Sequence, residues 1–110
     1  MKRTDFAGAL YRYFRDYLVN DRGCSARTIE TYRYAFIQFI DYMENHLNIR
    51  PEKIELTHIN VQNLQSFLLW LEREKKVSTS TRNQRLAAFK SFSSFLKYDL
   101  PECLDNVIQI

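Results

Sequence analysis

Residues 25–43 read SARTIETYRYAFIQFIDYM, and this stretch decides the fold class. Its apolar residues recur at three- and four-residue spacing, which places them on one face of an α-helix. Ser25 precedes the pattern, and its hydroxyl can accept a hydrogen bond from a free backbone N–H of the first turn. We therefore predict a helix over residues 26–47 with Ser25 as its N-cap. The predicted buried stripe consists of Ile29, Tyr32, Phe36, Phe39, Ile40 and Met43.

Three other segments show the same helical periodicity, and stop and start signals separate them. The predicted helices cover residues 5–20, residues 58–75 after an N-cap at Thr57, and a stretch from Ser78 or Ser80 to Leu100 and Pro101. Their inward faces consist of Phe6, Leu10, Tyr13, Phe14 and Tyr17, then Leu64, Phe67, Leu68 and Leu71, and finally Leu86, Phe89, Phe92 and Leu96. No segment alternates with a period of two, so the predicted fold class is all-α.

The composition agrees with one packed helical domain and excludes several other classes of protein. The chain has 110 residues, 45% of them hydrophobic, with only 2 Gly and 2 Pro. A chain of this length forms one domain with one hydrophobic core. Cys24 and Cys103 belong to no CxxC pattern, so we expect neither a disulfide framework nor a metal site, and nothing indicates a cofactor. The charged amino end and the lack of a long apolar run predict a cytoplasmic domain without a signal peptide or membrane span.

Positive charge and hydroxyl groups gather at the starts of the second and fourth predicted helices. The net charge is only +3, but residues 75–98 contain no carboxylate. Ser/Thr hydroxyls, Lys/Arg side chains and helix amino ends bind phosphate oxygens, whereas Arg and Asn can also read base edges. The candidate DNA-binding residues are Ser25, Arg27, Thr28, Thr31 and Arg33 in the second helix, with Ser78, Thr79, Ser80, Thr81, Arg82, Asn83, Arg85 and Lys90 in the fourth.

These clusters also have a simpler explanation. From charge alone, a basic run on a helix is more often a solvated face than a binding site. The Ser and Thr residues are equally explained as N-caps, and Arg82 lies near the edge of the apolar stripe. A helical protein–protein interaction module with an incidental basic face is therefore the alternative function, because a small helical fold does not decide between the two.

The chain resembles the core-binding domain of tyrosine recombinases, the family of phage integrases and Xer proteins. The resemblance rests on residues 25–43, on LTHINVQNLQSFLLWL at 56–71, and on STSTRNQRLAAFKSFSSFL at 78–96. The residues that fill the family's recurring positions are Ser25, Thr28, Ile29, Tyr32 and Phe36, then Ser78, Thr81, Asn83, Arg85, Leu86, Ala88, Lys90, Phe92, Phe95 and Leu96. Arg82 stands where the family usually has Ile or Val, and Gln84 replaces a frequent Arg.

The resemblance implies a small four-helix bundle of the SAM-like type, which forms one jaw of a clamp around duplex DNA. The second and fourth helices would then face the major groove at a recombination half-site, during DNA integration or recombination. Residues 1–101 would form the core-binding domain, and residues 102–110 would begin a linker to a catalytic domain. The implied partners are double-stranded DNA, that catalytic domain and other recombinase protomers in a synaptic complex.

The sequence itself predicts no catalysis by this domain. Recombinases of this family attack DNA with a tyrosine hydroxyl, but the family places that tyrosine in the catalytic domain. Here Tyr13, Tyr17 and Tyr32 fall on core stripes, where packing explains them. His46 and His58 are isolated near helix ends, and no carboxylate pair or phosphate-binding glycine loop is present. We therefore expect no catalytic residue in this chain.

Overall fold

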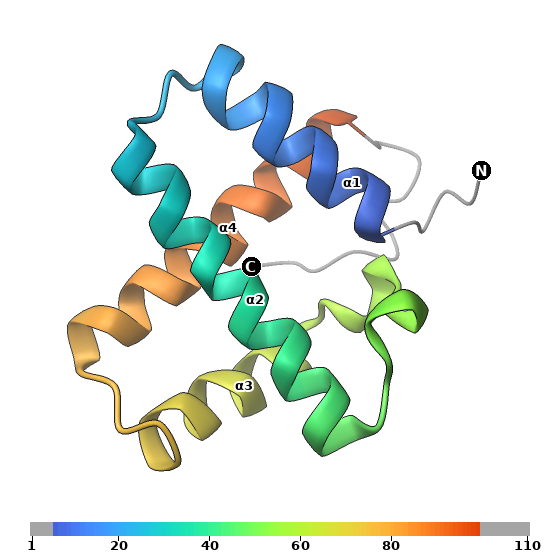
Figure 1. Cartoon of the computed structure of the whole chain (residues 1–110), viewed down its shortest axis with the longest axis vertical. Helices are drawn as coiled ribbons and strands as arrows, with labels where there is room; N and C mark the ends of the chain where they lie inside the picture. The colour runs from blue at the N-terminus through green and yellow to red at the C-terminus, as the bar shows by residue number, and fades with distance from the viewer. Residues whose placement is uncertain (1–5, 100–110) are drawn as a thin grey trace.

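The computed structural model describes residues 6–99, and it confirms the all-α fold class. The elements in chain order are α1 (Phe6–Arg12), η1 (Tyr13–Asp21), α2 (Ala26–Leu47), η2 (Pro51–Lys53), η3 (Leu56–His58), α3 (Val61–Arg73) and α4 (Thr79–Asp99), and no strand occurs in this range (Figure 1). The helices form a small four-helix bundle in which α2 crosses α4. No helix of the described part is long and apolar enough to cross a membrane. The linker predicted at residues 102–110 lies outside the described residues.

The first predicted helix is continuous, but its second half is a π-helix rather than an α-helix. Element η1 follows α1 directly, and the N–H of Arg22 donates to the carbonyl of Tyr17 at 2.9 Å, a five-residue step. The buried residues of this segment include Tyr13 and Leu18, which are also five positions apart. The wider π turn puts both side chains on the core face, and this explains why the regular α pattern missed Leu18.

The amino ends of α2 and α4 follow the prediction, whereas the start of α3 does not. Ser25 caps α2, and of the two candidates for α4 the structure selects Ser78, whose Oγ accepts the N–H of Thr81 at 3.1 Å. The prediction of Thr57 as the cap of α3 is wrong. Asn60 is the N-cap, and its side chain accepts the N–H of Asn63 at 2.8 Å.

A separate 3₁₀ turn explains this later start of α3. The backbone N–H of Glu55 donates to Nδ1 of His58 at 2.8 Å, and the N–H of His58 donates to the carbonyl of Glu55 at 3.0 Å. These bonds close the turn η3 upon itself before the α-helix begins. His58 is thereby a capping residue, which agrees with the prediction that it has no catalytic role.

Aromatic rings fill the core between the helices. Phe36 of α2 packs against Phe89 and Phe92 of α4, with ring centres 4.7 and 5.2 Å apart, and against Tyr13 of η1 at 6.0 Å. Every residue predicted to face inward is either buried or packed against this core. Tyr13 is fully buried, and its hydroxyl donates to Oγ of Ser91 at 2.9 Å. Burial raises the pKa of the Tyr13 phenol, so this tyrosine is a neutral packing residue.

Candidate nucleic-acid interface

The amino-terminal halves of α2 and α4 lie along the same side of the bundle (Figure 1). A groove of about 420 Å³ separates them. Its lining consists of Arg27, Glu30, Thr31 and Tyr34 from α2, with Gln84 and Arg85 from α4. The two regions that the sequence marked as candidates, far apart along the chain, therefore form the two walls of one groove.

Both helices begin with the same arrangement of hydroxyl groups. At α2, Oγ of Ser25 accepts the N–H of Thr28 at 3.2 Å and donates to Oγ1 of Thr28 at 3.1 Å. At α4, Ser78 makes the equivalent contacts with Thr81, both at 3.1 Å. These hydroxyls thus act as caps, and the N–H groups of the first two residues of each helix have no intrahelical acceptor. Those exposed N–H groups can receive an anion.

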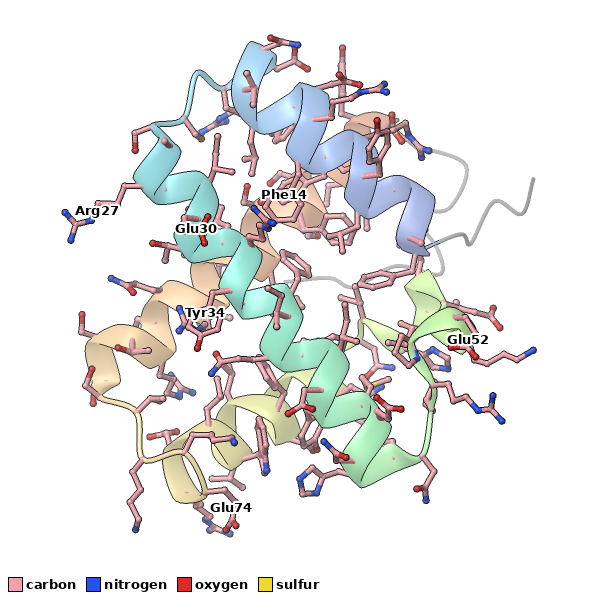
Figure 2. The ribbon with its side chains drawn as sticks, viewed as in Figure 1. Phe14, Arg27, Glu30, Tyr34, Glu52 and Glu74 are labelled. Carbon is pink, nitrogen blue, oxygen red and sulfur yellow. The ribbon has the colours of Figure 1, made fainter. Side chains whose placement is uncertain are left out.

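The cationic candidates differ in what they contact. Arg27 projects from the first turn of α2 into solvent (Figure 2), and Lys90 of α4 is also exposed. Arg33 lies 3.8 Å from Glu30 in an exposed i,i+3 pair, which contributes little to stability. Arg82 is half-buried, and its Nε lies 2.9 Å from Oε1 of Glu72 on α3. Arg27 and Lys90 are therefore the cations best placed to meet an incoming phosphate.

The remaining polar candidates have local roles or stay exposed. Oγ1 of Thr31 donates to the backbone carbonyl of Arg27 at 3.0 Å. Thr79, Ser80 and Asn83 are exposed at the start of α4, and the amide oxygen of Asn83 accepts from Arg82 at 3.4 Å. The exposed side chains of Thr79, Ser80 and Asn83 leave this end of α4 open to a large partner.

Arg85 occupies an unusual position because it is only 7% exposed. Its Nε donates to Oε1 of Gln38 on α2 at 2.8 Å, and its guanidinium carbon lies 5.2 Å from the ring centre of Tyr34. Tyr34 projects from α2 toward α4 (Figure 2). Sequence reasoning missed Gln38, Tyr34 and Glu72. For Gln38 a signal was present, since it is a polar residue between Phe36 and Phe39 in the middle of the buried stripe of α2.

The two serine caps give a first prediction about stability. Replacing Ser25 or Ser78 with alanine removes the acceptor for a first-turn N–H, so each variant should lose about 1 kcal/mol of unfolding free energy. Urea denaturation followed by circular dichroism measures the change. Ser66→Ala, at an exposed position inside α3, is the matched control and should change stability little. Equal stabilities of all three variants would contradict the capping roles.

The structure contains no sign of a metal centre in the part that it describes. No group of three His, Cys, Asp or Glu side chains among residues 6–99 lies close enough together to hold an ion. His46 stacks on Tyr42 with ring centres 5.1 Å apart and lies 5.3 Å from Trp70, so its contacts are aromatic packing.

Sequence comparison identifies relatives of the whole helical region. A curated protein of Sinorhizobium fredii named "Putative integrase/recombinase y4rC" is 31% identical over 101 residues, which is 92% of this chain and 30% of that protein. The tyrosine recombinase XerC of a Roseiflexus species is 36% identical over 83 residues, which is 76% of this chain and 25% of that protein. The chain thus spans between a quarter and a third of the length of these relatives. No solved structure gives a significant match.

The family profile covers the same elements that build the groove. The profile described as "Phage integrase, N-terminal SAM-like domain" matches residues 12–99, from the end of α1 to the end of α4. The helical architecture, the relatives and this match agree. The chain belongs to the family of N-terminal SAM-like domains of phage integrases, whose relatives here are tyrosine recombinases.

Proposed function

We propose that this domain binds duplex DNA at a recombination half-site, as the core-binding domain of a tyrosine recombinase. The observation that carries the proposal is the groove between α2 and α4, whose walls combine Arg27, Thr31 and Arg85 with two open helix amino ends. A surface of this kind positions phosphates through charge, hydroxyls and backbone N–H groups. Thr79, Ser80 and Asn83 extend the surface beyond the groove, where Asn83 has the chemistry to read an adenine edge.

The proposal assigns DNA cutting and joining to other parts of a longer recombinase. The chain covers at most about a third of its relatives, and the tyrosines Tyr13, Tyr17 and Tyr32 pack in or against the core rather than facing the groove. In this proposal residues 102–110 begin a linker to the catalytic domain, other protomers join the complex at synapsis, and the protein acts in the cytoplasm on DNA.

An NMR titration with duplex DNA tests the proposal directly. We expect the backbone amides of residues 25–33 and 78–90 to shift together, while those of residues 64–71 stay unchanged. The domain supplies one half of a clamp, so its affinity should lie in the nonspecific range of about 10⁻⁴–10⁻⁶ M. That affinity should fall steeply as salt rises, because bound phosphates release counterions. Shifts confined to α1 and α3, or none at low salt, would contradict the proposal.

The alternative function, a protein–protein interaction module, is favoured by a second groove. This groove of about 820 Å³ lies between α1 and α2 and is mainly apolar, with Leu10, Phe14, Ile37 and Ile40 in its lining. Tyr11 and Ile37, which also line it, are 61% and 53% exposed. Binding through such a surface depends weakly on salt, whereas binding of DNA through phosphates depends strongly on it. The salt dependence of the titration therefore distinguishes the two functions.

A further inference from the structure

Arg85 is a buried cation that lacks a carboxylate partner among the described residues. Its 7% exposure removes most of its hydration, and none of the ion pairs within residues 6–99 includes it. Burial lowers the pKa of Arg85 from its ordinary value, and the nearby Tyr34 opposes that shift. A charge removed from water is stabilised when an opposite charge meets it. The folded domain supplies only a neutral amide and an aromatic ring.

The contacts of Arg85 leave one edge of its guanidinium open. Nε is bound to Gln38, and no other hydrogen bond of this side chain forms within residues 6–99. The two terminal nitrogens thus keep their N–H groups for a ligand, and Arg85 lines the groove between α2 and α4. The planar fork of a guanidinium matches two oxygens of one phosphate group. Glu30, the one carboxylate in the groove lining, is paired with Arg33 at 3.8 Å.

We propose that this groove is a binding site for a single phosphate group, in which Arg85 binds the anion and Gln38 and Tyr34 are positioning residues. Gln38 fixes the rotation of the guanidinium through Nε, and Tyr34 covers one face of it. Because both partners are uncharged, they orient the cation without neutralising it. That the anion is a phosphodiester of DNA rests on the proposed function, whereas the anion site itself rests on the groove and on Arg85.

The substitution Gln38→Glu tests the positioning role, because it should change stability and binding in opposite directions. A glutamate at this place has the same shape and supplies the missing carboxylate to Arg85. We expect a higher unfolding temperature, together with about tenfold weaker binding of duplex DNA at low salt, since one phosphate contact is lost. The slope of affinity against salt should fall by about one unit. Gln65→Glu, exposed on α3, introduces the same charge away from the groove and should leave the slope unchanged.

Inorganic phosphate probes the same site without DNA. The Nε–H of Arg85 is buried and hydrogen-bonded, so its NMR signal should be resolved from those of the exposed arginines. We expect this signal to shift and saturate as phosphate is added to the parent domain, at constant ionic strength. The shift should be absent in Gln38→Glu. Arg85→Met keeps the side-chain volume and removes the charge, so it should raise the unfolding temperature and reduce the salt slope of DNA binding by about one unit.

Two results would overturn the site. One is that Gln38→Glu or Arg85→Met lowers the unfolding temperature along with DNA binding, as expected of a contact that only supports the fold. The other is that phosphate leaves the Nε–H signal of Arg85 in place. A parent domain that binds phosphate at Arg85 but no duplex would instead contradict the proposed function and leave the anion site standing.

Discussion

Replacing Phe36 with alanine should lower the free energy of unfolding by about 3–5 kcal/mol, because a large buried ring is removed and a cavity remains. Phe36 is 1% exposed, and its ring lies between those of Phe89 and Phe92 on α4 and that of Tyr13 on η1. The total stability of a small domain is about 5–15 kcal/mol, so this one substitution removes a large share of it. Thermal and urea unfolding measure the effect.

The adjacent residue provides the control for this prediction. Ile37 is 53% exposed on the same helix, so Ile37→Ala should change the unfolding free energy by less than about 0.5 kcal/mol. If both variants unfolded at the same urea concentration as the parent, the packing of α2 on α4 would not be the main source of stability.

Reversing the charge of Arg27 and Lys90 together should weaken duplex binding by about 100-fold or more at low salt, because two cations that attract phosphate become anions. Both side chains are exposed and neither forms an ion pair within residues 6–99, so the double variant Arg27→Glu, Lys90→Glu should fold normally. Fluorescence anisotropy with a labelled duplex at several salt concentrations gives both the affinity and its salt slope.

A control variant with the same net charge separates a local effect from a global one. Arg50 and Lys53 are exposed at η2, on the side of the bundle away from the amino ends of α2 and α4 (Figure 1). The double variant Arg50→Glu, Lys53→Glu should retain most of the affinity. Equal losses in the two double variants would mean that net charge, rather than the α2–α4 surface, governs DNA binding.

The fold followed from the sequence where local chemistry and periodicity agreed. The helix over residues 26–47 was predicted with its observed bounds, because Ser25 caps it and its apolar spacing is regular. The start of α3 was missed, since a histidine at position 58 closes a separate turn by a contact that helix propensity does not encode. The π segment was missed for a related reason. Its hydrogen bonding is set by packing of Leu18 against the core rather than by residue type.

The candidate site was predicted as two clusters, but its internal organisation was not. Caps such as Ser25 and Ser78 are local, so the sequence shows them. The Arg85–Gln38 hydrogen bond joins α4 to α2 and depends on how the helices cross, which no pattern along the chain records. The same holds for Arg82, whose partner Glu72 lies on α3.

The π segment between Tyr13 and Asp21 also bears on how this domain tolerates changes in chain length. Helical turns widened to five-residue steps accommodate one residue more than an α-helix would over the same path. Removing one residue between Tyr13 and Leu18 would restore the four-residue spacing of an α-helix and keep both side chains on the core face. Relatives could therefore gain or lose a residue here without repacking the core, and an alignment gap within this segment would mark a change of helix type rather than a loop.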